Sequence, residues 1–252
     1  MNRLFRALIL LILMSISVKG VCQITTDNVR EGLKGKVATM KMTDYGIYPD
    51  IKSSSFSLFD AQGYIINAVY SDSLQSPAYI WKFKYDDKKR ILKLTEIKGG
   101  KVQSIYTNIY DTKGHLVQQN LATNERTYFK PVKYFFKYNK KGQLIEVYSE
   151  TYGVDISPSK KVFTYDKNGL RIIQSTYNSE GYLMNKAFMT YNDHRDIIKI
   201  VHYYDVMSPN VFSTNLYSYI YDKKGNWVVK KSKENNSSKF EITQTRKITY
   251  YQ

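Results

Sequence analysis

Residues 110–116 read Tyr-Asp-Thr-Lys-Gly-His-Leu, and similar stretches recur along the chain as its repeating unit. Asp or Asn at the first turn position and Gly at the fourth are the preferences of a type I turn. The glycine supplies the left-handed residue of a three-residue loop with a bulge, so each stretch predicts a β-hairpin. In that hairpin Asp111 pairs with the residue after the glycine, and the ring of Tyr110 pairs with Leu116.

The unit recurs in eight copies at a period of about 26 residues. The aromatic residues that open the copies are Phe59, Tyr85, Tyr110, Tyr138, Tyr165, Tyr177, Tyr191 and Tyr221. The six complete copies have the turn residues Asp60 and Gly63, Asp111 and Gly114, Asn139 and Gly142, Asp166 and Gly169, Asn178 and Gly181, and Asp222 and Gly225. In the other two copies, Lys89 and Arg195 replace the glycine.

Seven of the eight copies place an apolar residue opposite the aromatic ring, a cross-strand pair worth roughly 0.2–1 kcal/mol. Tyr165 is the exception because its partner is Arg171, and we expect that hairpin to slip or to turn differently. The flanking segments alternate, as in residues 81–85 (Trp-Lys-Phe-Lys-Tyr), with an aromatic face and a face rich in lysine. We therefore predict an all-β fold of about sixteen strands, an antiparallel meander of repeated hairpins that forms one strongly curved open sheet or a barrel-like shell.

Residues 1–22 are typical of a signal peptide, because two arginines precede an uncharged apolar run that is too short to span a bilayer. We expect cleavage after Cys22; acylation of Cys22 as a lipid anchor is the alternative, which the branched residue before the cysteine disfavours. Residues 23–35 are an irregular lead-in, and residues 36–252 form the repeat domain. We predict an exported chain in the periplasm, at the cell surface or outside the cell, with no transmembrane helix in its mature form.

The chain is strongly basic, with a net charge of +16, and removal of residues 1–22 leaves 35 basic and 22 acidic residues. An exported protein of this charge favours anionic surfaces such as lipid phosphates or acidic glycans over nucleic acid. The alternative interpretation is a solvated sheet face, because many of the lysines alternate with aromatic residues along the strands.

The spacing Tyr-Asp-x-x-Gly-x-Leu resembles the YD repeat of rearrangement-hotspot (RHS) proteins and their short secreted bacterial relatives. Residues 221–227 and 245–251 resemble the closing segment of those short proteins, and residues 32–37 are similar to their first strand. The resemblance implies an architecture: uncharacterised relatives have a long curved sheet described as porin-like, and large toxins coil the repeat into a shell. It implies no activity, because one repeat hosts many functions.

Catalysis has little support, because the chain lacks the motifs of nucleophilic, zinc-dependent and phosphate-binding enzymes. We expect His115 to be exposed, and we interpret His194 and His202 as surface residues rather than metal ligands. The turns supply one acid each, and Asn139 takes the same place without charge, so turn capping explains the aspartates better than calcium does. We predict no catalytic residue, no cofactor and no metal.

The 24 tyrosines and two tryptophans are the richest functional candidates, because their rings suit stacking on sugars or rigid contact with a protein. The rings of the repeat motif are explained as sheet core. The candidates for a surface binding role are therefore Tyr45, Tyr48, Tyr152 and Tyr203. Ser73 is a candidate for O-glycosylation, because Asp-Ser-Leu resembles an acceptor used in bacterial cell envelopes.

These observations predict a non-catalytic envelope or secreted module that presents a curved sheet to a glycan or an envelope protein. The alternative is a barrel-like carrier or an outer-membrane pore, in which the aromatic face meets lipid and the lysines line a lumen. A toxin-shell fragment and an enzyme of unknown chemistry are the less favoured hypotheses.

Overall fold

The computed structural model describes residues 32–45, 52–72, 78–123, 132–151, 160–204, 212–234 and 237–252. These residues form sixteen strands: β1 (Val37–Tyr45), β2 (Lys52–Phe59), β3 (Ile65–Asp72), β4 (Tyr79–Tyr85), β5 (Ile91–Lys98), β6 (Lys101–Tyr110), β7 (Leu116–Thr123), β8 (Val132–Tyr138), β9 (Leu144–Thr151), β10 (Lys160–Tyr165), β11 (Arg171–Tyr177), β12 (Leu183–Tyr191), β13 (Ile197–Tyr204), β14 (Phe212–Tyr221), β15 (Trp227–Glu234) and β16 (Glu241–Tyr250). Within these residues no helix is long and apolar enough to cross a membrane.

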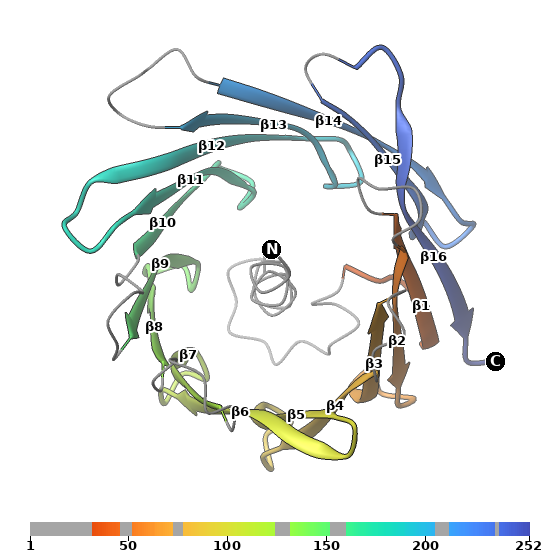
Figure 1. Ribbon diagram of the computed structural model, residues 1–252, viewed down its shortest axis with the longest axis vertical. Helices are drawn as coiled ribbons and strands as arrows, with labels where there is room; N and C mark the ends of the chain where they lie inside the picture. The colour runs from red at the N-terminus through yellow and green to blue at the C-terminus, as the bar shows by residue number, and fades with distance from the viewer. Residues whose placement is uncertain are drawn as a thin grey trace.

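Each strand pairs antiparallel with the next, and β1 pairs with β16, so that the sheet closes into a barrel (Figure 1). The prediction of an all-β antiparallel meander is confirmed. Of the two shapes that the sequence allows, the closed barrel is the one observed. The pairing of Val37 with Tyr250 brings together the first and last strands of the described chain.

The hairpin register agrees with the prediction at the seven copies with an apolar partner, including Tyr85 with Ile91 and Tyr221 with Trp227. The expectation that the Tyr165 hairpin slips is wrong, because Tyr165 pairs with Arg171 through the same bulge. The turn residues, which the Tyr165 copy shares with the others, fix the register whatever residue stands opposite the ring. The guanidinium of Arg171 then lies 4.0 Å from the centre of the Phe163 ring.

The side chain of each turn Asp or Asn caps its own loop. In the first turn, Oδ1 of Asp60 accepts hydrogen bonds from the backbone N–H of Gln62 and of Tyr64, both at 2.9 Å. Asn139 makes the same pair of bonds in the β8–β9 turn. An acceptor oxygen is therefore what the position requires, and the amide and the carboxylate supply it equally well.

Lys89 and Arg195 occupy the left-handed position with φ of 58° and 70°, where the other copies have glycine. Because this conformation strains a residue that has a Cβ, we expect Lys89→Gly to raise the free energy of unfolding by about 0.5–1 kcal/mol. The reverse change, Gly181→Lys, puts the new Cβ in open space and therefore tests backbone strain. We expect it to lower stability by a similar amount in urea unfolding; equal midpoints for all three proteins would contradict this reading.

The copy that starts at Tyr177 has a different position in the barrel from the others, although its turn has the same backbone hydrogen bonds. It connects β11 to β12 at one rim of the barrel, whereas the seven other copies turn at the opposite rim. The sequence carries a signal for this, because Tyr177 lies about halfway along the interval from Tyr165 to Tyr191.

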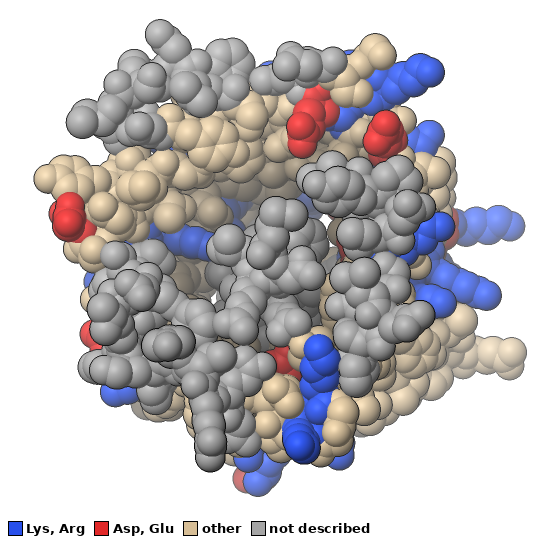
Figure 2. Space-filling model, in the orientation of Figure 1, with Lys and Arg blue, Asp and Glu red and all other residues tan. Residues whose placement is uncertain are grey.

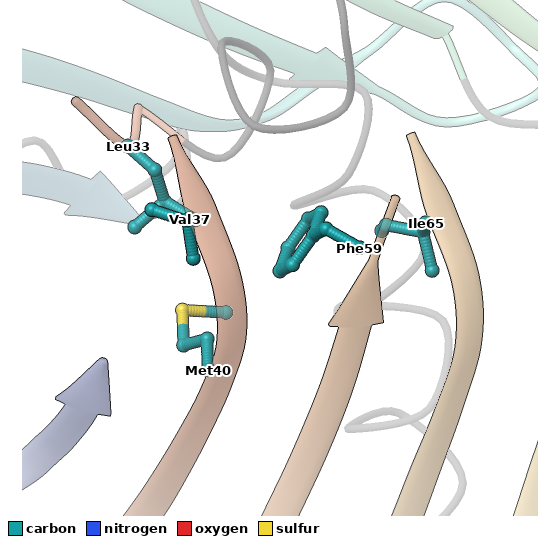
Figure 3. Close-up of a cluster of buried hydrophobic side chains, with 5 residues drawn as sticks. All are labelled: Leu33, Val37, Met40, Phe59 and Ile65. Carbon is teal, nitrogen blue, oxygen red and sulfur yellow. The ribbon is translucent and has the colours of Figure 1, made fainter. Parts of the chain in front are cut away.

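Alternate residues of each strand form an inner and an outer face. Side chains on the concave face of a closed sheet converge, and those on the convex face diverge. The buried clusters therefore mark the inner face, and the largest comprises Leu33, Val37, Met40, Phe59 and Ile65 (Figure 3). Exposed lysines alternate with them along the strands, and Figure 2 shows basic side chains projecting from the outer wall.

Candidate functional site

Five of the seven motif tyrosines tie their hairpin to the preceding hairpin at the same rim of the barrel. The hydroxyl donates to the backbone carbonyl of the residue that pairs with the preceding motif ring at that rim, as in Tyr138 to Leu116 at 3.0 Å. Four more tyrosines make this bond at 2.6–2.9 Å, namely Tyr85, Tyr110, Tyr165 and Tyr191. Burial raises the pKa of Tyr191 to about 12, which keeps its hydroxyl protonated as a donor at neutral pH. These tyrosines are structural, as the sequence indicates, but the hydrogen bonds that their hydroxyl groups make to the neighbouring hairpin were not predicted.

One aromatic group on the inner wall spans β3 to β6. Trp81 lies parallel to Tyr106 with the ring centres 6.3 Å apart, and Tyr70 lies 6.4 Å from Tyr79. The buried carboxyl group of Glu96 belongs to the same face, because Glu96 pairs with Trp81. Burial, with a smaller contribution from Glu96, raises the pKa of Tyr106 well above its usual range. This part of the wall offers flat rings and hydroxyl groups.

A second aromatic group on the inner wall includes the other tryptophan. The guanidinium of Arg246 lies 3.6 Å from the ring centre of Trp227, and Tyr219 lies 6.1 Å from that ring. Lys230 faces Tyr219 from β15. Burial and the neighbouring Arg246 lower the pKa of Lys230, whereas the carboxylate of Asp44 opposes the shift. A counter-charge is therefore present in this group.

A third group lies on β10 and β11, where Lys161, Phe163 and Arg171 share the inner face. Burial, and secondarily the charge of Arg171, lower the pKa of the Lys161 ammonium group. These inward cations were not predicted, because the lysines were assigned to the wet face. A signal existed, since two consecutive lysines in a strand, as at residues 160–161, cannot both point outward.

The three histidines lie in different settings. The expectation that His115 is simply exposed is wrong: Nδ1 of His115 lies 3.0 Å from the Asp111 carboxylate, and its ring stacks on Tyr138 at 4.6 Å. His194 is exposed and stacks on Tyr221. His202 points inward, and burial lowers its pKa. No group of three or more metal-ligating side chains occurs among the residues that the structure describes.

Two of the predicted surface tyrosines can be located. Tyr45 ends β1, half-buried, with the ammonium group of Lys52 5.4 Å from its ring centre. Tyr203 is 43 % exposed on β13 and meets the edge of Phe188. These strands are not neighbours, so the two tyrosines form no common site. Tyr48, Tyr152, Ser73, Cys22 and most of residues 1–35 lie outside the described residues, and the hypotheses about them stay predictions.

The fold defines the chain as a single-chain antiparallel β-barrel. It is similar to a porin-like protein from Bacteroides uniformis, with a TM-score of 0.58 and 10 % identity over 86 % of this chain and 99 % of that one. A porin-like protein from Bacteroides vulgatus matches over the same shares with a TM-score of 0.47 and 12 % identity. The Photorhabdus luminescens Tc holotoxin pore matches over 75 % of this chain and 11 % of that chain, with a TM-score of 0.28 and 14 % identity.

No family model and no curated protein sequence matches the chain. The similarity to the Bacteroides uniformis structure supports a porin-like curved sheet. The resemblance to the YD repeat remains an expectation from the sequence.

Proposed function

We propose that this chain is an exported, non-catalytic carrier that binds a saccharide against the inner wall of its barrel. The observation that carries the proposal is that both tryptophans face inward together with the tyrosines beside them, Tyr106 and Tyr219. About eight strands enclose a space that their own side chains fill, whereas barrels of about sixteen strands are wide enough to leave an internal channel. Flat aromatic rings with adjacent hydroxyl groups suit the faces and edges of sugar rings.

The outer wall argues against a barrel that spans a bilayer. A membrane barrel needs an outward apolar belt, and a lysine at the bilayer midplane costs about 2–4 kcal/mol. Here exposed lysines stand within strands on several sides of the barrel, namely Lys41, Lys82, Lys199 and Lys247. The carrier form of the barrel therefore fits the charge pattern better than the pore form does.

An envelope location agrees with the signal-peptide pattern of residues 1–22 and with a net charge that attracts acidic surfaces. In this proposal the outer lysines contact anionic envelope components, while the inner wall holds the cargo. The sequence suggested that a glycan binds at surface tyrosines, whereas this proposal places the glycan at the inner face of the barrel.

The two tryptophans make the proposal testable, because the chain has only Trp81 and Trp227. We expect titration of the detergent-free protein with oligosaccharides to shift the tryptophan emission in a saturable way. In the single variants Trp81→Phe and Trp227→Phe, the emission comes from the one remaining tryptophan. We expect at least one of the two variants to keep the shift.

Exchange of an outer ring provides the control, since Tyr203→Phe alters neither tryptophan nor inner wall. It should leave the titration unchanged. An emission spectrum that no oligosaccharide changes, or aggregation of the protein without detergent, would count against the carrier.

A further inference from the structure

The third inner-wall group is unusual because it brings two cations together without an acidic partner among the described residues. Lys161 points inward between Val147 on β9 and Thr176 on β11. Phe163, two residues further along β10, faces the same way and is buried. Arg171 reaches over that ring, with its guanidinium 4.0 Å from the ring centre.

No acidic side chain among the described residues forms an ion pair with Lys161 or Arg171. The Nε of Arg171 is shielded from solvent and has no hydrogen-bond partner among the described residues. The nearest carboxylate of the same hairpin, Asp166, has its Oδ1 engaged by the backbone N–H of Asn168 and of Leu170. Two half-buried cations that lack a counter-charge are costly, and an anionic ligand group would offset that cost.

The Trp227 group shows a partly neutralised arrangement in the same barrel. There, Lys230 and Arg246 lie near Asp44, whose carboxylate accepts a hydrogen bond from Gln244. The β10–β11 group has two cations and a ring but no equivalent of Asp44 in the part of the wall that the structure describes. A ligand that binds at this group therefore has to bring the negative charge itself.

We propose that Lys161 and Arg171 bind an acidic group of the saccharide, and that the protein's ligands are sugars that carry a carboxylate or sulfate. This inference rests on the proposed carrier function and specifies its ligand class. The guanidinium supplies paired N–H donors for a planar carboxylate, and the ammonium supplies a mobile point charge. Phe163 provides a flat apolar contact next to them. The lowered pKa of Lys161 agrees with this role, because a bound anion would favour the charged ammonium.

The test uses two probes with the same sugar skeleton, an oligogalacturonate and its methyl ester, which differ in charge. We expect isothermal titration calorimetry to show that the acid binds about ten- to a hundredfold more tightly than the ester. Lys161→Met with Arg171→Met should reduce the affinity for the acid to that for the ester. The fold should survive, because the backbone carbonyl of Arg171, which accepts the Tyr191 hydroxyl, is retained.

The matched control removes two outward lysines, Lys84→Met with Lys93→Met, which pair across β4 and β5 and change the net charge equally. This control should keep the preference for the acid, and Arg171→Lys should keep most of it. Equal binding of acid and ester, or a preference that survives in the Lys161–Arg171 variant, overturns the acidic-ligand inference and leaves the carrier intact. If neither probe binds and tryptophan emission responds to no sugar, both proposals fail.

Discussion

Phe59→Ala is expected to lower the free energy of unfolding by about 3–5 kcal/mol. Phe59 is 0 % exposed and is the largest fully buried side chain among the described residues. It packs in the cluster with Val37, Met40 and Ile65, next to the junction of the first and last strands. Because inner-wall neighbours are held by strand pairing, they cannot collapse into the space, and a cavity remains.

Urea unfolding followed by circular dichroism measures the effect. Phe56→Ala is the matched control, since Phe56 lies on the same strand, faces outward and is 41 % exposed. That change should cost less than about 1 kcal/mol. Equal losses in the two variants would contradict the assignment of inner and outer faces.

Asn226→Leu is expected to cost about 2–5 kcal/mol, because it removes three hydrogen bonds that help to close the barrel. Asn226 is 2 % exposed. Its Oδ1 accepts from the backbone N–H of Lys34 at 2.6 Å, while its Nδ2 donates to the Lys34 carbonyl at 2.8 Å and to the Tyr250 hydroxyl at 2.7 Å. Leucine leaves both backbone groups of Lys34 without these partners.

The turn itself should tolerate the change, since Leu170 occupies the equivalent position, directly after the glycine, in the β10–β11 turn. Gln143→Leu, at the same position of the β8–β9 turn, is the control away from the junction. We expect it to lower the melting temperature far less than Asn226→Leu does. A similar loss in both would mean that the turn, and not the link to Lys34, is what Asn226 supports.

The local structure could be read from the sequence because it depends on neighbours in the chain. An Asp or Asn, two spacers and a glycine fix the turn, and the turn fixes which residue faces the ring, even where that residue is Arg171. Closure could not be read in this way. The pairing of Met40 with Ile248 depends on the number of strands and on the curvature they accumulate, which no single repeat encodes.

The candidate site on the inner wall was predicted less well than the hairpins, for a related physical reason. The sequence shows that aromatic residues and lysines alternate, but it does not say which face becomes concave. The alternation also does not distinguish one lysine from another, although Lys82 is exposed on the outside while Lys161 and Lys230 face inward. The interruptions of the alternation at residues 160–161 and 230–231 were the usable signal, and they mark the cationic groups.

The pairing of β1 with β16 also governs how this protein can meet other proteins. An open sheet ends in strands whose free N–H and C=O groups invite another chain to add on, a common route to fibrils and swapped dimers. In the described wall every strand has a neighbour on both sides. Recognition at the wall must then proceed through side chains. A lysine-rich protein of this kind can remain dispersed at high concentration in a crowded compartment without features that protect an exposed edge strand.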